Sequence, residues 1–593
     1  MAIMRTTVPR FRYPSTGCKS MIITSTARQI LKDSYDLDAE LTLLYGELDD
    51  NFLAVTGNGE KRILKIMHAG CKEQCVDLQC QAMAHLAETA AELNLPRVIP
   101  TKAGQLYAVV SVDGVDRLVW SLMFCPGTSL AEFTPHTDEV MRSFGRTMGL
   151  LDIGLKSFTH PAMRQGHRWE LTRAAAARLL VQHLAGDVAR EVDAALRRFE
   201  NVTAEKLEHL PHSVIHNDAN DDNVLVNVTE DGCGAVDGLI DFGDITYQPI
   251  VCEVAIALAY AVLDKDDPLT VCARFLEAYN EVKPLSGDEL AVLYDLIMTR
   301  LAVSIAIAPA CRIEDPDDTY NSANKDPAIR ALSLLGDLSP RVAECQFRQA
   351  CSLPVTENAE TATRYIQSSE LNRSEVIRTD GGSIVLNLSK NINLLGSDPR
   401  DLELERLAAL IDGAIGEAGA SFGFGRYAEP RALYNNENFG DPDQASGCRT
   451  VHLGIDVFCS ADTPVYSPLD ARVELLANNN RELDYGPMLV LRHTTDAGEP
   501  FFTLYGHLNS SCLDALEVGQ ELAAGDQIAA VGRPPENGNW PPHLHLQLIL
   551  DLLDLDADFP GVATASQQEL WCALSPSPAC FFQEFDPTEL RYK

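Results

Sequence analysis

One stretch of the chain, residues 212–247, constrains the fold and the chemistry more than any other. Its sequence, HSVIHNDANDDNVLVNVTEDGCGAVDGLIDFGDITY, predicts a strand, a polar loop, a second strand, a Gly- and Asp-rich turn and a third strand. The loop holds His216, Asp218 and Asn223 in the spacing HxDxxxxN, and the last apolar run ends at Asp241. Loops are rich in Asp and Asn, so HxDxxxxN alone is a weak signal. The Asp-Phe-Gly that follows it makes the pair of motifs a strong one.

These residue types fit phosphoryl transfer, which needs few protein groups. One carboxylate orients or deprotonates the attacking hydroxyl, and a carbonyl oxygen with a second carboxylate holds Mg²⁺ on the phosphates. Asp218 suits the first task, and Asn223 with Asp241 suits the second. The alternative is an ordinary loop followed by a core strand, which does not account for the two motifs in order.

The two motifs resemble those of the aminoglycoside phosphotransferase and choline kinase-like superfamily, and the hydroxylysine kinase-like branch is the most similar. The resemblance implies a two-lobed kinase-like fold that uses ATP or GTP with Mg²⁺. It implies that Asp218 is the catalytic base, that Asn223 and Asp241 hold the metal, and that Lys65 binds the nucleotide phosphates. Lys65 lies in RILKIM, after a hairpin signal at Gly57-Asn58-Gly59. The alternative for Lys65 is a lysine that protects an edge strand.

Other parts of a kinase can be placed by the same resemblance. The segment 46–52 takes the position of the phosphate-covering turn, and 124–127 takes that of the hinge that reads the nucleotide base. A helix is predicted over 73–95, and the partner of Lys65 on it stays open. The carboxylates available for that pairing are those of Glu73, Asp77 and Glu88, and Gln79 occupies a position where relatives often have Gln. Asp221 and Asp222 could attract an ammonium group of the substrate, or form a solvated loop face. Glu253 could hold the catalytic loop in shape, or be a solvated acid at the start of a helix.

A second group of polar residues lies near the C-terminus, in a stretch whose short alternating segments predict β-structure. His452 and Asp456 stand four residues apart in HLGID, His507 follows in YGHL, and His543 and His545 form HLH. Residues two apart on a strand point to the same face, so we expect His543 and His545 to converge. Zinc favours imidazole and carboxylate ligands, and a catalytic zinc has three of them.

The three motifs, HxGxD, YxHL and HxH, resemble those of the lysostaphin/LytM-type zinc metallopeptidases. The resemblance implies that His452, Asp456 and His545 bind Zn²⁺ and that His507 and His543 are catalytic. The substrate would be a peptide or an amide. A metal-stabilised interaction module is the alternative, but it leaves His507 and His543 without a task.

Composition excludes several other classes of function. The net charge of −37 argues against binding to nucleic acid or to an anionic membrane, and we expect no membrane-spanning run. The 16 cysteines lack a C-x-x-C pair, so we expect reduced thiols. The first 32 residues contain no acid, which is typical of an organelle transit peptide, but Pro9 and Pro14 would break a helix there. We expect a cytoplasmic protein with a flexible N-terminal extension.

The pattern of segments predicts a multidomain α+β protein. We expect a flexible extension over 1–25, a two-lobed kinase-like domain over 26–350, a linker and interdomain segment over 351–446, and a mainly antiparallel β metallopeptidase-like domain over 447–593. Within the linker, 424–440 is rich in aromatic and charged residues. We interpret it as an interdomain clasp, with a contribution to a neighbouring site as the second interpretation.

The chain is therefore expected to be a small-molecule kinase fused to a zinc-dependent peptidase- or amidase-like domain. The acceptor would be an amino alcohol or hydroxy amino acid such as 5-hydroxylysine. The alternatives are a zinc peptidase with a regulatory or inactive kinase-like domain, and an active kinase beside an interaction module. Fusions of this kind also carry a class III aminotransferase-like domain, which implies such a partner here, and this sequence stops at Lys593 without room for one.

Overall fold

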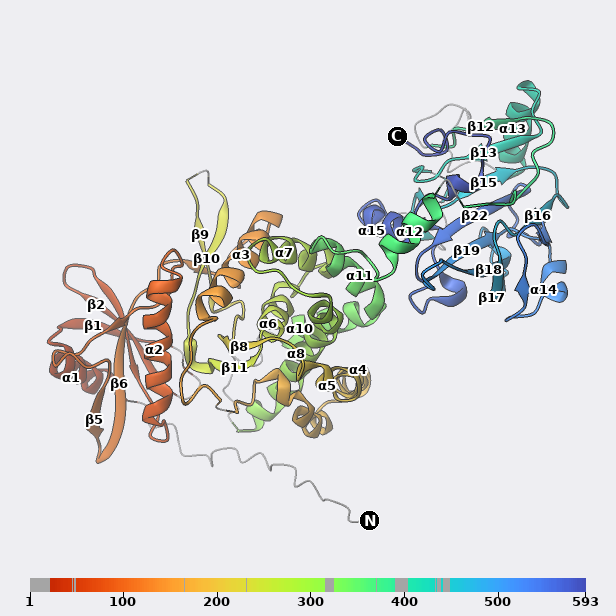
Figure 1. Ribbon diagram of the computed structural model, residues 1–593. Coiled ribbons are helices and arrows are strands. Elements are labelled where there is room, and N and C mark those ends of the chain that lie inside the picture. The colour runs from red at the N-terminus through yellow and green to blue at the C-terminus, as the bar shows by residue number, and fades with distance from the viewer. Residues whose placement is uncertain are drawn as a thin grey trace, which may run out of the picture. The chain divides into compact units, whose positions relative to one another are not determined.

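The structure is a computed structural model. It describes residues 22–44, 46, 49–164, 166–230, 232–314, 325–368, 371–389, 404–431, 433–434, 439–440 and 448–593. The chain divides into two compact units, 1–351 and 352–593 (Figure 1). Residues 1–21 of the expected flexible extension and targeting segment, and part of the phosphate-covering turn, lie outside the described residues. The helix Thr24–Tyr35 begins within the segment that was expected to be flexible.

The first unit begins with an antiparallel sheet of six strands. Their order is β1-β2-β3-β6-β4, and β5 also pairs with β6. The predicted hairpin at 57–59 is confirmed, since Gly59 adopts a φ of 84° between two paired strands. The strands are β1 (Ala39–Leu44), β2 (Asp50–Thr56), β3 (Lys61–Ile66), β4 (Val98–Ile99), β5 (Ala108–Val112) and β6 (Val115–Met123). Helix α1 (Thr24–Tyr35) packs its apolar side on this sheet in one hydrophobic cluster.

The rest of the first unit is mostly helical. Its small strands form two groups, β10-β9-β7 and β11-β8. They are β7 (Thr128–Ser129), β8 (His212–Ile215), β9 (Val224–Val228), β10 (Gly234–Leu239) and β11 (Thr246–Pro249). The helices are α2 (Glu73–Thr89), α3 (Asp138–Leu155), α4 (Gly186–Arg198), α5 (Ala204–Leu207), α6 (Val251–Ala261), α7 (Pro268–Val282), α8 (Gly287–Glu314), α10 (Lys325–Gly336) and α11 (Pro340–Ala350), with a 3-10 segment at Leu171–His183.

Helix α8 corrects the expectation that no run reaches membrane-spanning length. Within the described residues, its part Gly287–Pro309 is long and apolar enough to cross a membrane. However, 83% of the tested window is buried inside the protein, as expected for the core helix of a globular unit.

The second unit is built on one long sheet. The strand order is β12-β13-β15-β22-β19-β18-β17-β20, and all pairs are antiparallel except β12 with β13. The strands are β12 (Ser383–Val385), β13 (Phe422–Gly425), β15 (Ile455–Phe458), β17 (Ala471–Asn479), β18 (Gly486–Thr494), β19 (Pro500–Gly506), β20 (Glu521–Leu522) and β22 (His543–Ile549). The unit also has two short strand pairs, β14 (Val451–His452) with β23 (Val562–Ala563) and β16 (Pro464–Tyr466) with β21 (Gln527–Ala530). Its helices include α12 (Ala359–Gln367), α13 (Leu404–Glu417), α14 (Ser511–Ala515) and α15 (Gln568–Leu574).

Strand register brings the polar residues of this sheet together. Asp456 on β15 lies opposite His545 on β22, and Gly506 at the end of β19 lies opposite His545 on the other side. β13 pairs with β15 so that Gly425 lies opposite Asp456. β12 and β13 come from the segment 351–446 that the sequence assigns to a linker, and both belong to this sheet.

The expected fold class is confirmed. The first unit combines an antiparallel sheet with a helical region, and the second unit is mostly antiparallel β. The domain bounds given from the sequence remain predictions.

A glycine in α3 tests the packing of the first unit. A Cβ atom on Gly145 would lie 2.0 Å from the Phe275 carbonyl oxygen on α7, so Gly145→Ala must push two helices apart. We expect the free energy of unfolding of this unit to fall by about 1–3 kcal/mol. At the matched control Gly336→Ala, the nearest atom is 3.8 Å away at Met298 Cε. We expect the melting temperature of Gly336→Ala, measured by calorimetry, to be unchanged or slightly raised. Equal melting temperatures for the two variants would contradict the close packing at Gly145.

Candidate functional site

The residues of the first motif converge around the loop between β8 and β9. Lys65 Nζ on β3 lies 3.1 Å from Asp241 Oδ1, directly after β10. Asn223 Nδ2 donates to Asp218 Oδ2 at 2.8 Å and to the Asp218 carbonyl oxygen at 3.0 Å. These two bonded pairs lie near each other, since the charge of Asp241 acts on Asp218. The four residues come from three separate parts of the chain.

The ion pair between Lys65 and Asp241 shifts both groups toward their charged forms. Burial alone would lower the pKa of Lys65, but the carboxylates of Asp241 and Asp49 outweigh it and raise that pKa. The charge of Lys65 lowers the pKa of Asp241. Asp241 also has a φ of 61°, an unusual backbone conformation for a non-glycine residue and one that often marks functional sites.

Asp218 has a different environment. Burial and the nearby charge of Asp244 raise its pKa to about 7, while Arg300 opposes that shift. Arg300 Nη2 lies 3.2 Å from Asp218 Oδ1, and Asn220 Nδ2 donates to Asp218 Oδ2 at 3.1 Å. A carboxylate whose pKa lies near neutrality suits a group that accepts a proton and releases it again.

Two buried side chains fix the shape of this loop. His216 Nε2 donates to the Ile240 carbonyl oxygen at 3.1 Å and its Nδ1 accepts from the Asp218 backbone N–H at 3.2 Å, which defines one neutral tautomer. Burial lowers the pKa of His216 to about 4. Glu253 is fully buried and accepts from the Asn217 backbone N–H at 3.1 Å, so it supports the loop and does not lie in solvent.

Two of the candidate acids on helix α2 contact partners other than Lys65. Glu73 Oε1 accepts from the Tyr107 hydroxyl at 2.7 Å, and Asp77 Oδ2 lies 3.1 Å from His160 Nε2. In this structure the carboxylate bonded to Lys65 is therefore Asp241.

Arg300 is a site residue that sequence reasoning missed. It is 1% exposed on α8 and lies over the rings of Trp169 and Tyr260, at 4.9 and 5.4 Å from their centroids. The available signal was an arginine directly before the apolar run LAVSIAIAPA of the same helix. A charge in such a position is rarely kept unless it pairs with another group.

In the second unit, three donor atoms of the predicted metal ligands meet. His452 Nε2 lies 3.0 Å from His545 Nδ1 and 3.1 Å from Asp456 Oδ1, and the latter two atoms are 3.0 Å apart. All three residues are buried, and this trio is the one His/Cys/Asp/Glu group of metal-binding spacing within the described residues.

The hydrogen bonds behind the trio determine which atoms face inward. His452 Nδ1 donates to the Arg426 carbonyl oxygen at 3.1 Å, and His545 Nε2 donates to Gln547 Oε1 at 3.1 Å. The amide nitrogen of Gln547 donates elsewhere, to Pro560 and Ser575, which fixes its oxygen as the acceptor. Three acceptor atoms therefore face one another, and a bound cation would offset the repulsion between their lone pairs.

This donor set fits zinc. Two imidazoles and one carboxylate match the three protein ligands of a catalytic zinc site, and a fourth position stays available. Burial lowers the pKa of His452 to about 4, with the charge of Arg431 acting in the same direction, so the imidazole is neutral as a metal ligand must be. Gly454 has no space for a side chain, since a Cβ would lie 2.6 Å from His545 Cε1.

Two further histidines face the trio. His507 Nδ1 donates to the Asn537 carbonyl oxygen at 3.0 Å, and His543 Nδ1 donates to the Pro541 carbonyl oxygen at 2.7 Å. Each ring thus keeps Nε2 for the site, and His543 Nε2 lies 3.8 Å from Asp456 Oδ1. The ring centroids of His507 and His543 are 4.3 Å apart, and His507 has a φ of 61°.

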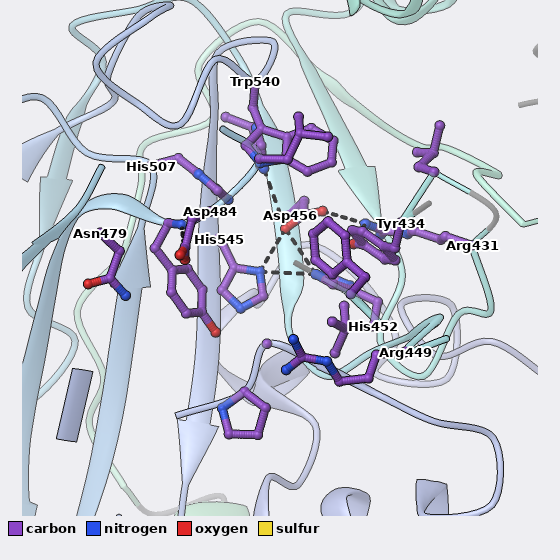
Figure 2. Close-up of a pocket in the computed structure, with 18 of the residues that line it drawn as sticks. Arg431, Tyr434, Arg449, His452, Asp456, Asn479, Asp484, His507, Trp540 and His545 are labelled. Carbon is purple, nitrogen blue, oxygen red and sulfur yellow. Dashed lines mark hydrogen bonds and ion pairs between the residues drawn. The ribbon is translucent and has the colours of Figure 1, made fainter. Parts of the chain in front are cut away.

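A pocket of about 240 Å³ opens in front of these five residues (Figure 2). One part of its lining is apolar and includes Leu407, Tyr434, Phe439 and Trp540. The polar part includes Arg449, Asn479, Arg481 and Asp484. Figure 2 shows Asp456 between His452, His545 and the guanidinium of Arg431.

Arg431 is the second residue that sequence reasoning missed. Its Nη1 lies 2.6 Å from Asp456 Oδ2. It comes from the aromatic and charged segment 424–440, which was interpreted first as a clasp and second as a contribution to a neighbouring site. The unusual composition of that segment was the available signal. Within this segment, residues 432 and 435–438 lie outside the described part of the chain.

Comparison with known families agrees with both resemblances. Residues 42–290 match the Phosphotransferase enzyme family, and residues 450–556 match Peptidase family M23. The chain therefore carries a phosphotransferase-family domain, and a peptidase-family M23 domain follows it.

Individual relatives match the first part of the chain. Hydroxylysine kinase of Danio rerio is 27% identical over 339 residues, which are 55% of this chain and 95% of that protein. Homoserine kinase of Methylobacillus flagellatus is 29% identical over 264 residues, 43% of this chain and 76% of that protein. The solved structure of a microcompartment-associated aminopropanol kinase is 18% identical, with a TM-score of 0.41, and covers 56% of this chain and 100% of that one.

Removal of one donor tests the metal site. His545→Ala should lower bound zinc from about one ion per chain to well below that value, because two donors cannot hold the ion tightly. His493→Ala is the matched control, since His493 is equally buried but bonds to Asp470 and Thr503. Metal analysis after gel filtration checks both variants, and unchanged zinc in His545→Ala would remove this residue from the ligand set.

Proposed function

We propose that the first unit transfers the γ-phosphoryl group of ATP or GTP to the hydroxyl of a small amino alcohol or hydroxy amino acid. The observation that carries this proposal is the loop in which Asp218 is held by Asn223 and Arg300, close to the Lys65–Asp241 pair. These are the few groups that phosphoryl transfer needs.

Each residue has a defined task in this reaction. Asp218 accepts the proton of the acceptor hydroxyl as that oxygen bonds to the γ-phosphorus, while the bond from this phosphorus to the β–γ bridging oxygen breaks and ADP or GDP leaves. Asn223 uses its amide nitrogen to hold Asp218, which leaves its Oδ1 for a metal, and Asp241 supplies the carboxylate. Mg²⁺ bound there would neutralise charge on the phosphates. Lys65 would then exchange part of its contact with Asp241 for the nucleotide phosphates.

A hydroxy amino acid resembling 5-hydroxylysine is the acceptor that we favour. Two of the relatives are named as kinases of hydroxyl-bearing amino acids, hydroxylysine and homoserine. The strongly negative net charge suits a substrate that carries an ammonium group. Asp244, whose charge contributes to the raised pKa of Asp218, is the nearby acid that such an ammonium group would meet.

We further propose that the second unit is a zinc-dependent peptidase or amidase. The inward-facing donors of His452, Asp456 and His545 would bind the ion, and bound zinc lowers the pKa of a water ligand to about 7. The Nε2 atoms of His507 and His543 would hold and move the proton of that water. The pocket of about 240 Å³ favours a small peptide or amide metabolite over a polymer.

An acceptor panel tests the first activity. The full chain with Mg²⁺ and either ATP or GTP should phosphorylate one member of a set that includes 5-hydroxylysine, homoserine, ethanolamine, choline and an aminoglycoside. Failure with every acceptor, in a chain that still binds zinc, would favour a regulatory kinase-like unit. A parallel panel of dipeptides and acyl amides tests the second unit.

Asp218→Asn tests the proposed base. The amide cannot accept a proton, so we expect turnover to fall by at least ~100-fold. Nucleotide affinity should stay within about twofold, because Lys65 and Asp241 remain in place. Titration with a fluorescent nucleotide and a coupled ADP assay provide the two measurements, and retained turnover would contradict the role of Asp218.

The raised pKa of Asp218 predicts a pH dependence. The base works only when ionised, so kcat/KM should fall as pH decreases through about 7. Arg300→Met removes a positive charge that stabilises the ionised form of Asp218. The fall of kcat/KM on the acidic side should therefore occur at a higher pH in this variant. Arg300→Lys keeps the charge and should leave this fall near that of the natural chain. Measurement of kcat/KM between about pH 5.5 and 9 tests this expectation. The same acidic fall in Arg300→Met as in the natural chain would contradict the electrostatic coupling of Arg300 to Asp218.

A further inference from the structure

The segment 424–434 lies ahead of the residues that match Peptidase family M23, yet it contacts two of the three metal donors. Gly425 pairs with Asp456 in the sheet, so the chain leaves β13 beside the trio. The Arg426 carbonyl oxygen accepts from His452 Nδ1, and Arg431 Nη1 donates to Asp456 Oδ2 at 2.6 Å.

Arg431 is itself held in place on several sides. Its Nε donates to Glu429 Oε2 at 3.0 Å, and its Nη1 also donates to the Tyr434 hydroxyl at 3.1 Å. Glu429 is fully buried and accepts further bonds from Arg426 at 2.9 Å and from the Leu388 backbone N–H at 3.0 Å. A planar guanidinium bonded to two buried carboxylates has one orientation, which a lysine cannot reproduce.

The charges of this network alternate. Arg426, Glu429, Arg431 and Asp456 follow one another as positive, negative, positive and negative groups, and each neighbouring pair is bonded. The positive charge of Arg431 is therefore balanced by Glu429 and does not simply repel a cation at Asp456. Its bond occupies Oδ2 of Asp456, and Oδ1 alone is turned to His452 and His545.

We infer that Arg431 is a positioning residue of the metal centre, which makes Asp456 a one-oxygen ligand and thereby keeps the fourth position of the ion for water and substrate. This inference rests on the proposed metal-dependent function of the second unit. Without Arg431, Asp456 could rotate and offer both oxygens. Partners that orient metal ligands are commonly worth ~10–100-fold in metal affinity.

The test compares Arg431→Lys with Arg533→Lys in the full chain. Arg533 forms an exposed ion pair with Asp462 in the same unit, so it controls for an arginine-to-lysine change outside the site. Zinc affinity is measured by competition with a chromogenic chelator. We expect a loss of ~10–100-fold for Arg431→Lys and less than about twofold for Arg533→Lys.

The visible spectrum of the Co²⁺-loaded protein gives a second measurement that a loss of stability alone would not change. A change from one to two carboxylate oxygens raises the coordination number, so the d–d bands of Arg431→Lys should weaken and shift. If Arg431→Lys does not fold, Tyr434→Phe removes a single bond to Arg431 and should give a smaller loss in the same direction.

The possible outcomes distinguish failure of the proposed hydrolase function from failure of the positioning role of Arg431. If the natural chain binds neither zinc nor Co²⁺, the proposed hydrolase function fails, and this inference fails with it. If the natural chain binds metal and Arg431→Lys shows the same affinity and the same spectrum, Arg431 has no positioning role and the proposed function stands.

Discussion

In both units a carboxylate at the centre of the site is held by an arginine that is itself buried. Arg300 contacts Asp218, and Arg431 contacts Asp456. Transfer of a guanidinium from water to a protein interior costs several kcal/mol unless other groups take over its interactions. The surrounding structure provides them: two aromatic rings and a backbone carbonyl for Arg300, and Glu429 with Tyr434 for Arg431. In each site, a few buried groups therefore hold one positive charge in one orientation.

Much of the fold could be predicted from local patterns. The glycine pair around Asn58 gave the hairpin, alternation gave the strands of the second unit, and the spacing of two residues in HLH brought His543 and His545 to one face. The motif order also located Asp218, Asn223 and Asp241 in one loop system, since those residues are close in the chain. Their roles in catalysis remain predictions, although Asn223 is bonded to Asp218 and Asp241 is bonded to Lys65.

The features that could not be predicted from the sequence are contacts between distant segments of the chain. Lys65 and Asp241 are 176 residues apart, and their contact depends on how the sheet meets the helical region. Arg300 and Asp218 are 82 residues apart in the sequence. Arg300 lies on a helix whose apolar pattern predicts only that the helix is buried. Arg431 reaches Asp456 because β13 pairs with β15, and a strand of four residues containing two glycines gives no clear periodic signal. Periodicity gives the face of an element, but it does not give the neighbour on that face.

The position of β13 has a consequence for any attempt to isolate the region that matches Peptidase family M23. A fragment that begins at the family match, residue 450, would lack β12 and β13, and β15 would become the outer strand of the sheet. All four residues of β15 are buried in the full chain, and three of them are apolar. An outer strand of this kind presents unpaired N–H and C=O groups beside an apolar surface, which is the usual starting point for strand addition between copies. Poor solubility of such a fragment would then reflect an exposed sheet edge and would carry no information about its chemistry.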